Sequence, residues 1–461
     1  MHARTLTLPC LACILAACTG DDAPASSDST SAADTSGSGT SESATESTTA
    51  TTGPTSTTMT GSATESMTGS TMTTTVGTST TTGPVGCSDS DECTDPSAPV
   101  CVNDNCVPCT SDEQCEAKDA AAPACRTEVG DGMGQCVQCT AANPLACDGD
   151  TPVCDDAAGG CVGCSFHEQC PDSACEIATG ACFDTACVQE VDADGGQDFT
   201  TIESAISDEC VVIVHERNSD VPYQEHLNID GISVALIAAD GEQPRLTGTG
   251  GNPSLTVSGS GVAYVQGLNI RQNDVEGVFV DGGSVYLDRS AIVSNDGGGI
   301  ALTGGAYALV RNCFVGGNGN GGPNSTALRL AGSNADILYT SIVRNDATSN
   351  DSLVCDGGSN VTVRNSLLLG RDSSSVACTG ATVDNSVADE DLGGAGNLIE
   401  GSLDNGWFAD VFTGDFHLTA AGETEFTDVA QWQAGDPLVD IDGNARPTVD
   451  GTADVAGADI P

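Results

Sequence analysis

Cysteine is the residue type whose number and spacing say most about the chemistry of this chain. The sequence holds 24 cysteines in 461 residues, and seventeen of them fall within residues 87–187. Few large apolar residues lie between them, so covalent bridges must replace a hydrophobic core. Sixteen of the seventeen form four units of four: Cys87, Cys93, Cys101 and Cys106; Cys109, Cys115, Cys125 and Cys136; Cys139, Cys147, Cys154 and Cys161; Cys164, Cys170, Cys175 and Cys182.

We therefore predict disulfide-rich repeats over residues 87–187, with two bridges inside each unit. Four cysteines allow three pairings, and the sequence does not choose among them. Cys-x-x-Cys pairs at the unit boundaries are also typical of zinc sites. The region has a single histidine, His167, and the fourfold repeat accounts for all sixteen cysteines. Disulfides therefore explain the pattern better than zinc, and we predict no metal site here.

The N-terminus carries a separate cysteine signal. A short basic start precedes an apolar run over residues 6–17, which is long enough for a secretory signal and too short to span a bilayer. The run ends in Leu-Ala-Ala before Cys18, and this ending resembles the lipobox of bacterial lipoproteins. The resemblance implies that residues 1–17 are removed as a signal peptide and that Cys18 carries lipid. Thr19, in place of aspartate, implies sorting to the outer membrane by the rule of enteric bacteria.

The segment after the anchor has a composition that does not support folding. Residues 18–86 are almost entirely Ser, Thr, Gly, Ala, Asp and Glu, and such a segment cannot bury enough apolar surface to fold. We expect a disordered stalk that lifts the rest of the chain from the cell surface. The whole chain has a net charge of −53, which excludes nucleic acid as a partner because its phosphates would be repelled. Divalent cations and basic partners are compatible with this charge.

Residues 188–461 contain an internal repeat. Six similar apolar segments begin at residues 265, 287, 310, 338, 363 and 383, and each precedes a turn rich in Asn, Asp and Gly. Period-2 apolar segments that recur without helical stretches between them predict a coil of short parallel strands. The fourth position of the segments is expected to form an inward column of small residues: Leu268, Ser290, Cys313, Ser341, Ser366 and Ser386.

The repeat resembles the right-handed parallel β-helix family, which includes pectate lyases and pectin esterases. Residues 198–206 (DFTTIESAI) are similar to the helix that caps the N-terminal end of such coils, with Thr200 or Thr201 as its N-cap, and Tyr223-Gln-Glu225 is similar to the segment after the first strand. Residues 440–447 (DIDGNARP) and 454–459 (DVAGAD) resemble a common ending of surface β-helices. The resemblance implies an all-β fold over residues 188–461.

The remaining cysteines predict further contacts. Cys187 and Cys210 flank the junction between the cysteine-rich repeats and the coil, and we expect them to bridge it. A second short strand in each coil places Val280, Leu302, Leu330, Cys355 and Cys378 in one column. Equivalent Cα atoms of adjacent coils lie about 4.8 Å apart, within reach of a disulfide. We therefore predict a Cys355–Cys378 bridge and a buried free thiol at Cys313.

Motifs of catalysis are missing from the repeat. The aspartates and arginine of the pectin-esterase motifs have no counterparts here. The polygalacturonase motif Gly-His-Gly is also missing, since His417 lies in Phe-His-Leu. A row of Arg289, Arg311 and Arg364 with nearby aspartates is similar to a pectate-lyase site, but such rows are more often ladders of charge on the outer face. No catalytic residue is therefore predicted.

Asp440 and Asp442 could hold calcium, but the later glutamate of an EF-hand loop is missing. We expect a structural turn there and no cofactor, with calcium as the weaker alternative. The sequence favours a non-enzymatic surface protein that binds a glycan or a protein partner. A polysaccharide-active lyase or hydrolase with an atypical site is the alternative hypothesis, and a groove holding carboxylates with Arg, Lys or His would favour it.

Overall fold

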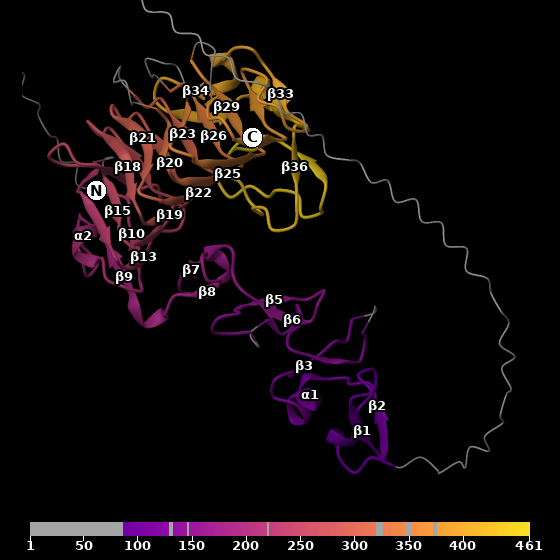
Figure 1. The fold of residues 1–461 in the computed structure, drawn as a ribbon. Helices are drawn as coiled ribbons and strands as arrows, with labels where there is room; N and C mark the ends of the chain where they lie inside the picture. Colours follow the sequence, from indigo (N-terminus) through magenta and orange to yellow (C-terminus); the bar gives the residue numbers. More distant parts are fainter. Residues whose placement is uncertain are drawn as a thin grey trace, which may run out of the picture. The chain divides into compact units, whose positions relative to one another are not determined.

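A computed structural model describes residues 86–128, 132–144, 147–218, 221–319, 326–345, 352–371 and 376–461. The predicted signal peptide, Cys18 and the stalk up to residue 85 lie outside the described residues. Strands stack one coil after another from β10 to β29, and the C-terminal strands β34 and β36 follow them in the chain (Figure 1).

Three parallel sheets build the coil, and the predicted all-β parallel β-helix is confirmed. The first sheet contains β9 (Val188–Val191), β10 (Cys210–Val214), β13 (Ser233–Ala238), β16 (Val262–Gln266), β19 (Ser284–Asp288), β22 (Tyr307–Arg311), β25 (Asn334–Leu338), β28 (Asn360–Arg364) and β31 (Thr382–Asp384). The second contains β11 (Tyr223–Gln224), β14 (Arg245–Thr247), β17 (Asn269–Arg271), β20 (Ala291–Val293), β23 (Phe314–Gly316), β26 (Ser341–Val343), β29 (Leu367–Leu369), β32 (Val387–Ala388) and β33 (Leu398–Ile399). The third contains β12 (Leu227–Asp230), β15 (Leu255–Ser258), β18 (Glu276–Asp281), β21 (Gly298–Thr303), β24 (Leu328–Ala331), β27 (Leu353–Asp356) and β30 (Val376–Ala377).

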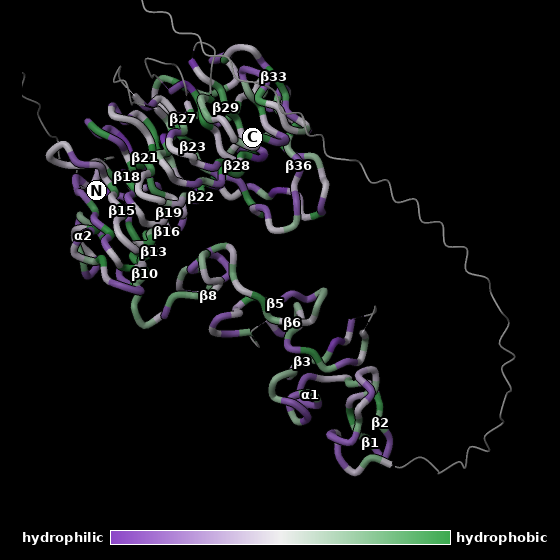
Figure 2. Tube along the Cα trace, viewed as in Figure 1, coloured by the Kyte–Doolittle hydropathy of each residue, from purple (hydrophilic) through white to green (hydrophobic). Residues whose placement is uncertain are grey.

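Alternating strand residues point into the coil, where aliphatic side chains of all three sheets form one core. Hydrophobic segments recur along the stacked strands in Figure 2. The pairing register differs from the predicted one in a single coil, where Ile337 and not Leu338 aligns with Val310. Both residues are apolar, so the sequence pattern does not fix which of them is buried. Leu338 instead packs outward against the C-terminal layer, and Thr340, not Ser341, occupies the column of small residues.

From β16 onward, each corner after the first sheet turns through a residue with positive φ, among them Arg289, Asn312 and Asn365. Asn tolerates this conformation better than most residues because its side chain bonds locally. Further along the coil, buried asparagines stack on successive turns. Asn273 Nδ2 donates to Asn295 Oδ1 at 2.6 Å, and Asn295 Nδ2 donates to Asn318 Oδ1 at 3.0 Å. The stack satisfies polar groups that would otherwise be buried without partners.

The N-terminal end of the coil is covered by α2 (Ile202–Ala205), as the sequence predicted. Thr201 is the N-cap residue, but its side chain makes no capping bond. Glu225 accepts hydrogen bonds from the backbone N–H groups of Ile202 (3.1 Å) and Glu203 (2.8 Å) instead. The glutamate of the Tyr-x-Glu segment therefore caps this helix from another part of the chain.

The three sheets end at Ile399, so the β-helix is shorter than the predicted range of 188–461. The rest of the chain forms a C-terminal layer: η6 (Asn405–Trp407), β34 (Phe408–Asp410), β35 (Asp415–Leu418), α3 (Ala420–Phe426), β36 (Ala430–Trp432) and β37 (Thr452–Asp454). Its aromatic residues, including Phe408 and Phe416, pack on outward-facing residues of the second sheet such as Phe314 and Leu367. This contact explains why the outer face of that sheet is apolar from β20 onward.

Each cysteine unit contains an antiparallel hairpin, and the hairpins are β1 (Val100–Val102) with β2 (Asn105–Val107), β3 (Ala124–Cys125) with β4 (Cys136–Val137), β5 (Val153–Asp155) with β6 (Gly160–Val162), and β7 (Cys175–Glu176) with β8 (Ala181–Cys182). The short helices of this region are η1 (Ser90–Glu92), α1 (Asp112–Lys118), η3 (His167–Gln169) and η4 (Thr185–Cys187).

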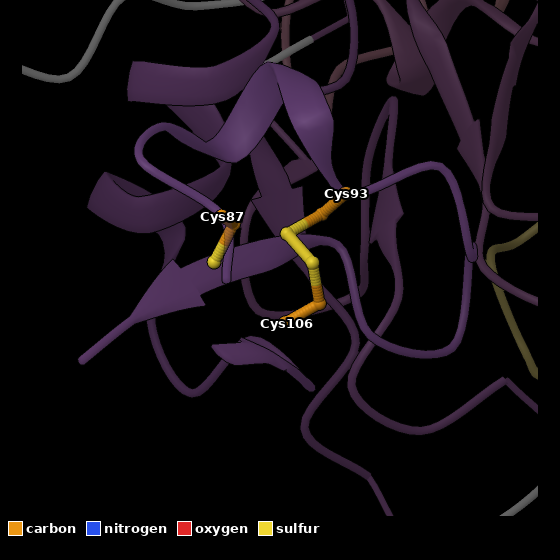
Figure 3. Close-up of side chains that lie close together, drawn as sticks. All are labelled: Cys87, Cys93 and Cys106. Atoms are coloured by element: carbon orange, nitrogen blue, oxygen red, sulfur yellow. A yellow bond between two sulfur atoms is a disulfide. The ribbon is translucent and has the colours of Figure 1, made fainter. Parts of the chain in front are cut away.

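Disulfides follow the same pairing in all four units: the first cysteine bonds the third, and the second bonds the fourth. The bridges are Cys87–Cys101, Cys93–Cys106, Cys109–Cys125, Cys115–Cys136, Cys139–Cys154, Cys147–Cys161, Cys164–Cys175 and Cys170–Cys182. Figure 3 shows the Cys93–Cys106 bridge with Cys87 beside it. Because these sulfurs are bonded to one another, they are not thiolate ligands for zinc.

Two further bridges involve cysteines of the coil. Cys187 is bonded to Cys210, and Cys355 is bonded to Cys378 with Cα atoms 4.6 Å apart. Leu330 pairs with Cys355 in the ladder, as the predicted column requires. Cys313 is a buried free thiol in the described part of the chain, and burial raises the pKa of this thiol to about 12.

Candidate functional site: an arginine-lined cleft

The outer face of the second sheet is only partly covered. The C-terminal layer covers it from Val293 and Phe314 onward. The two strands before this boundary, β14 and β17, carry polar residues outward, with Arg245 directly opposite Asn269 in the ladder. A cleft of about 310 Å³ lies where the covering layer ends.

Arginines line the cleft on the side of the coil. Arg245 and Arg271 come from adjacent strands, and Arg289 comes from the corner after β19. The chain has 13 basic residues against 66 acidic ones, so three basic residues in one cleft are a marked local excess. Asp415 also lines the cleft, and Arg289 is paired with Glu168. The arginines still outnumber the acidic residue of the lining, and an excess of one charge in a cleft attracts ligands of opposite charge.

Two buried polar atoms at this site have no partner among the described residues, namely Nε of Arg271 and Oδ1 of Asn269. Burial, followed by the positive charge of Arg245, lowers the pKa of Arg271. The second terminal nitrogen of Arg271 donates to the carbonyl of Thr413 at 3.2 Å, which holds the side chain against the C-terminal layer. Buried polar atoms normally find partners, so Arg271 and Asn269 are incompletely satisfied beside the cleft.

The other two predicted row arginines serve a structural role. Arg311 forms an ion pair with Asp288 at 2.7 Å, and both side chains are buried. Arg364 pairs with the buried Asp436 of the C-terminal layer. Arg289 lies one residue further along its coil than the Arg311 column, and it pairs with Glu168 of the fourth cysteine unit. The predicted row is therefore not a single ladder, and only Arg289 reaches the cleft.

The C-terminal layer forms the opposite wall. His417 on β35 lies at the cleft beside Phe314, with the ring centroids 4.9 Å apart. Its Nδ1 is 2.5 Å from Asp415 Oδ1, and its Nε2 is 3.1 Å from Asp442 Oδ2. The hydrogen bond to Asp442, and after it the bond to Asp415, raises the pKa of His417 to about 9 against the effect of burial.

Asp440 and Asp442, the residues of the weak calcium hypothesis, have different surroundings. Asp440 is fully buried, and its two carboxylate oxygens accept bonds from the backbone of Asp442, Asn444 and Ile460 and from the Asn444 side chain. It is thus the centre of a structural turn. Asp442 points instead towards His417.

Sequence reasoning missed Arg245, Arg271 and His417 as site residues. Arg245 and Arg271 belong to different coils, and only the stacking register brings them together. His417 joins them because the C-terminal layer folds back onto the second sheet. One feature could have indicated Arg245 and Arg271: both arginines lie on strands of a chain that is otherwise acidic.

Comparisons with known proteins support the fold. Residues 249–402 match a family model described as the right-handed β-helix region, so this part of the chain is a right-handed parallel β-helix. Residues 73–188 match a model described only as a family of unknown function. No curated protein and no solved structure matches the chain.

Proposed function

We propose that this protein is a lipid-anchored bacterial surface protein whose β-helical head binds an acidic glycan in the arginine-lined cleft. The observation that carries the proposal is the convergence of Arg245, Arg271 and Arg289 in a chain of charge −53. Elsewhere such a surface repels anions, so an acidic ligand is directed to this cleft.

Carboxylate is the group that the cleft suits best. A guanidinium presents paired donors that match the two oxygens of a carboxylate. The volume of about 310 Å³ is at the small end of the range for ligand pockets, which is about 300–1,000 Å³. A few uronic-acid residues of a longer chain would fit better than a large compact ligand.

Catalysis is the second candidate, because Asp415, His417 and Asp442 lie together at the opposite wall. Such a group beside arginines is the arrangement expected of a polysaccharide-active enzyme with an atypical site. Binding accounts for the arginines without a further reacting group, and we therefore prefer it. Variants of the arginines and of His417 distinguish binding from catalysis. Only an enzyme forms product from the glycan, so only an enzyme can lose product formation in these variants.

The anchor rests on the sequence alone. Among the described residues no helix is long and apolar enough to cross a membrane. The Leu-Ala-Ala-Cys18 ending supports lipid attachment at Cys18 and location in the outer membrane. Intact-mass analysis of the native protein should find a lipid on Cys18 and no residues 1–17. A Cys18→Ser variant that still sediments with membranes would contradict the anchor.

Affinity electrophoresis tests the cleft. The full chain should be retarded by polygalacturonate or alginate and not by a neutral glucan. Arg271→Gln should weaken retention about tenfold to a hundredfold, because each charge-assisted hydrogen bond contributes about 1.5–3 kcal/mol. Arg329→Gln is the matched control, since Arg329 pairs with Asp356 at 3.6 Å and does not line the cleft. Equal losses in both variants would show that binding follows overall charge, not the cleft.

A further inference from the structure

Three segments that are distant in sequence bring a histidine and two carboxylates together in the C-terminal layer. His417 lies on β35, Asp442 lies in the turn after Asp440, and Asp459 lies near the C-terminus. One potential ligand atom from each residue falls within 4.8 Å of the other two. The group is separate from the arginines, although His417 borders the same cleft.

Two of the three members, His417 and Asp459, are held in place by a neighbour. Asp415 accepts a hydrogen bond from His417 Nδ1 at 2.5 Å, which leaves Nε2 to face Asp442 Oδ2 at 3.1 Å. The backbone N–H of Leu418 donates to one oxygen of the buried Asp459 at 2.6 Å. A histidine that is oriented through one nitrogen by a carboxylate and faces ligands with the other is typical of metal centres.

We propose that His417 Nε2, Asp442 and Asp459 bind one divalent first-row cation such as Zn²⁺, with Asp415 as the positioning residue. Three protein ligands that include imidazole nitrogen suit Zn²⁺, which leaves a fourth position for water. Calcium prefers six to eight oxygen ligands, and the nearby Asp440 oxygens already accept backbone bonds. The ligand set therefore favours Zn²⁺ over Ca²⁺.

The charge around the group supports a cation. Asp415, Asp440, Asp442 and Asp459 gather near one histidine in a chain with an excess of acidic residues. The cation would connect β35, the turn at Asp442 and the C-terminal residues. It would thereby stabilise the C-terminal layer, which forms one wall of the cleft. This inference does not depend on glycan binding, because none of the three ligands is an arginine of the cleft.

Calorimetric titration tests the site on the full, oxidised chain after chelator treatment. With ZnCl₂ as the probe, we expect one tight site, and thermal unfolding should shift upward with Zn²⁺ and much less with CaCl₂. Asp459→Asn should abolish the tight site. Glu423→Gln, an exposed carboxylate in the same layer, is the control and should bind as the wild type does.

A second histidine provides the sharper control. His215 also lies between carboxylates, 3.5 Å from both Glu190 and Glu242. If Zn²⁺ binds at the proposed site, His417→Gln removes the tight site and His215→Gln does not. Equal effects of these two variants would overturn the proposal, as would wild-type binding in Asp459→Asn.

Asp415→Asn keeps the ligands and changes only the group that orients His417. Metal affinity should fall about tenfold to a hundredfold, the usual effect of losing such a partner. Asp459→Asn removes a buried carboxylate and could lower binding by failing to fold. Asp415→Asn keeps the Asp459 carboxylate, so a loss of affinity in Asp415→Asn does not have that explanation. Unchanged Zn²⁺ affinity in Asp415→Asn would overturn the positioning role of Asp415. Equal shifts of thermal unfolding with Zn²⁺ and Ca²⁺ would overturn the preference for Zn²⁺.

Discussion

Removal of the Cys355–Cys378 bridge should destabilise the coil by an amount that the chain length predicts. The bridge joins strands of adjacent coils and closes a segment with a sequence separation of 23 residues. In the chain-entropy model, closing a loop of this length lowers the entropy of the unfolded state and so raises the free energy of unfolding by about 3 kcal/mol. Both cysteines are only partly buried, so a double alanine variant leaves little cavity to add to that loss.

Cys187–Cys210 provides the matched comparison, because its sequence separation is also 23 residues. If loop closure dominates, Cys187→Ala with Cys210→Ala should cost about the same 3 kcal/mol. Guanidinium unfolding followed by the fluorescence of Trp407 and Trp432 measures both losses. Those are the only tryptophans of the chain, and both pack in the C-terminal layer.

The result that would refute this reasoning is a loss below about 1 kcal/mol for Cys355→Ala with Cys378→Ala, since a native bridge of this length normally contributes more. A large difference between the two double variants would instead show that local contacts, not chain entropy, set the contribution.

Three other perturbations have defined outcomes. Burial lowers the pKa of His167 to about 4 from an ordinary value near 6.5, so the unfolded chain takes up the proton first as the pH falls. The free energy of unfolding should therefore have its full value above about pH 6.5 and fall by about 3 kcal/mol as the pH drops to about 4. In His167→Gln, the denaturant midpoint should depend less on pH over this range. Asp454→Ala leaves the buried Arg446 without its ion-pair partner at 3.1 Å and should cost about 3–5 kcal/mol in the same assay, whereas Arg446→Met with Asp454→Leu should cost less. Thiol counting on unfolded, unreduced mature protein should find Cys313 as the free thiol besides any unlipidated Cys18, and three free thiols would contradict the Cys355–Cys378 bridge.

The coil could be predicted from sequence because its signal repeats. Period-2 segments indicated the strands, and their alignment placed Cys355 and Cys378 on adjacent coils. The same logic failed at Ile337 and Leu338, since two successive apolar residues satisfy either register. A one-residue slip changes which of them is buried, and only the packing of Leu338 against the C-terminal layer decides.

The C-terminal layer and the cleft could not be predicted in this way. Phe408 and Phe416 have no repeat that relates them to the second sheet, so the sequence does not show that they cover it. Arg245 and Arg271 come together through the stacking of coils, and His417 joins them through a long-range contact. The disulfide pairing within units was equally open, because three connectivities satisfy the same spacing.

The most direct test of the central claim measures binding and cleavage in one sample. The full chain is incubated with polygalacturonate or alginate, and the retained complex is measured together with new reducing ends and unsaturated products. A binding cleft predicts a stable complex that Arg271→Gln weakens, with polymer length unchanged. Shortening of the polymer that disappears in Arg271→Gln or His417→Gln would contradict the account and establish an enzyme.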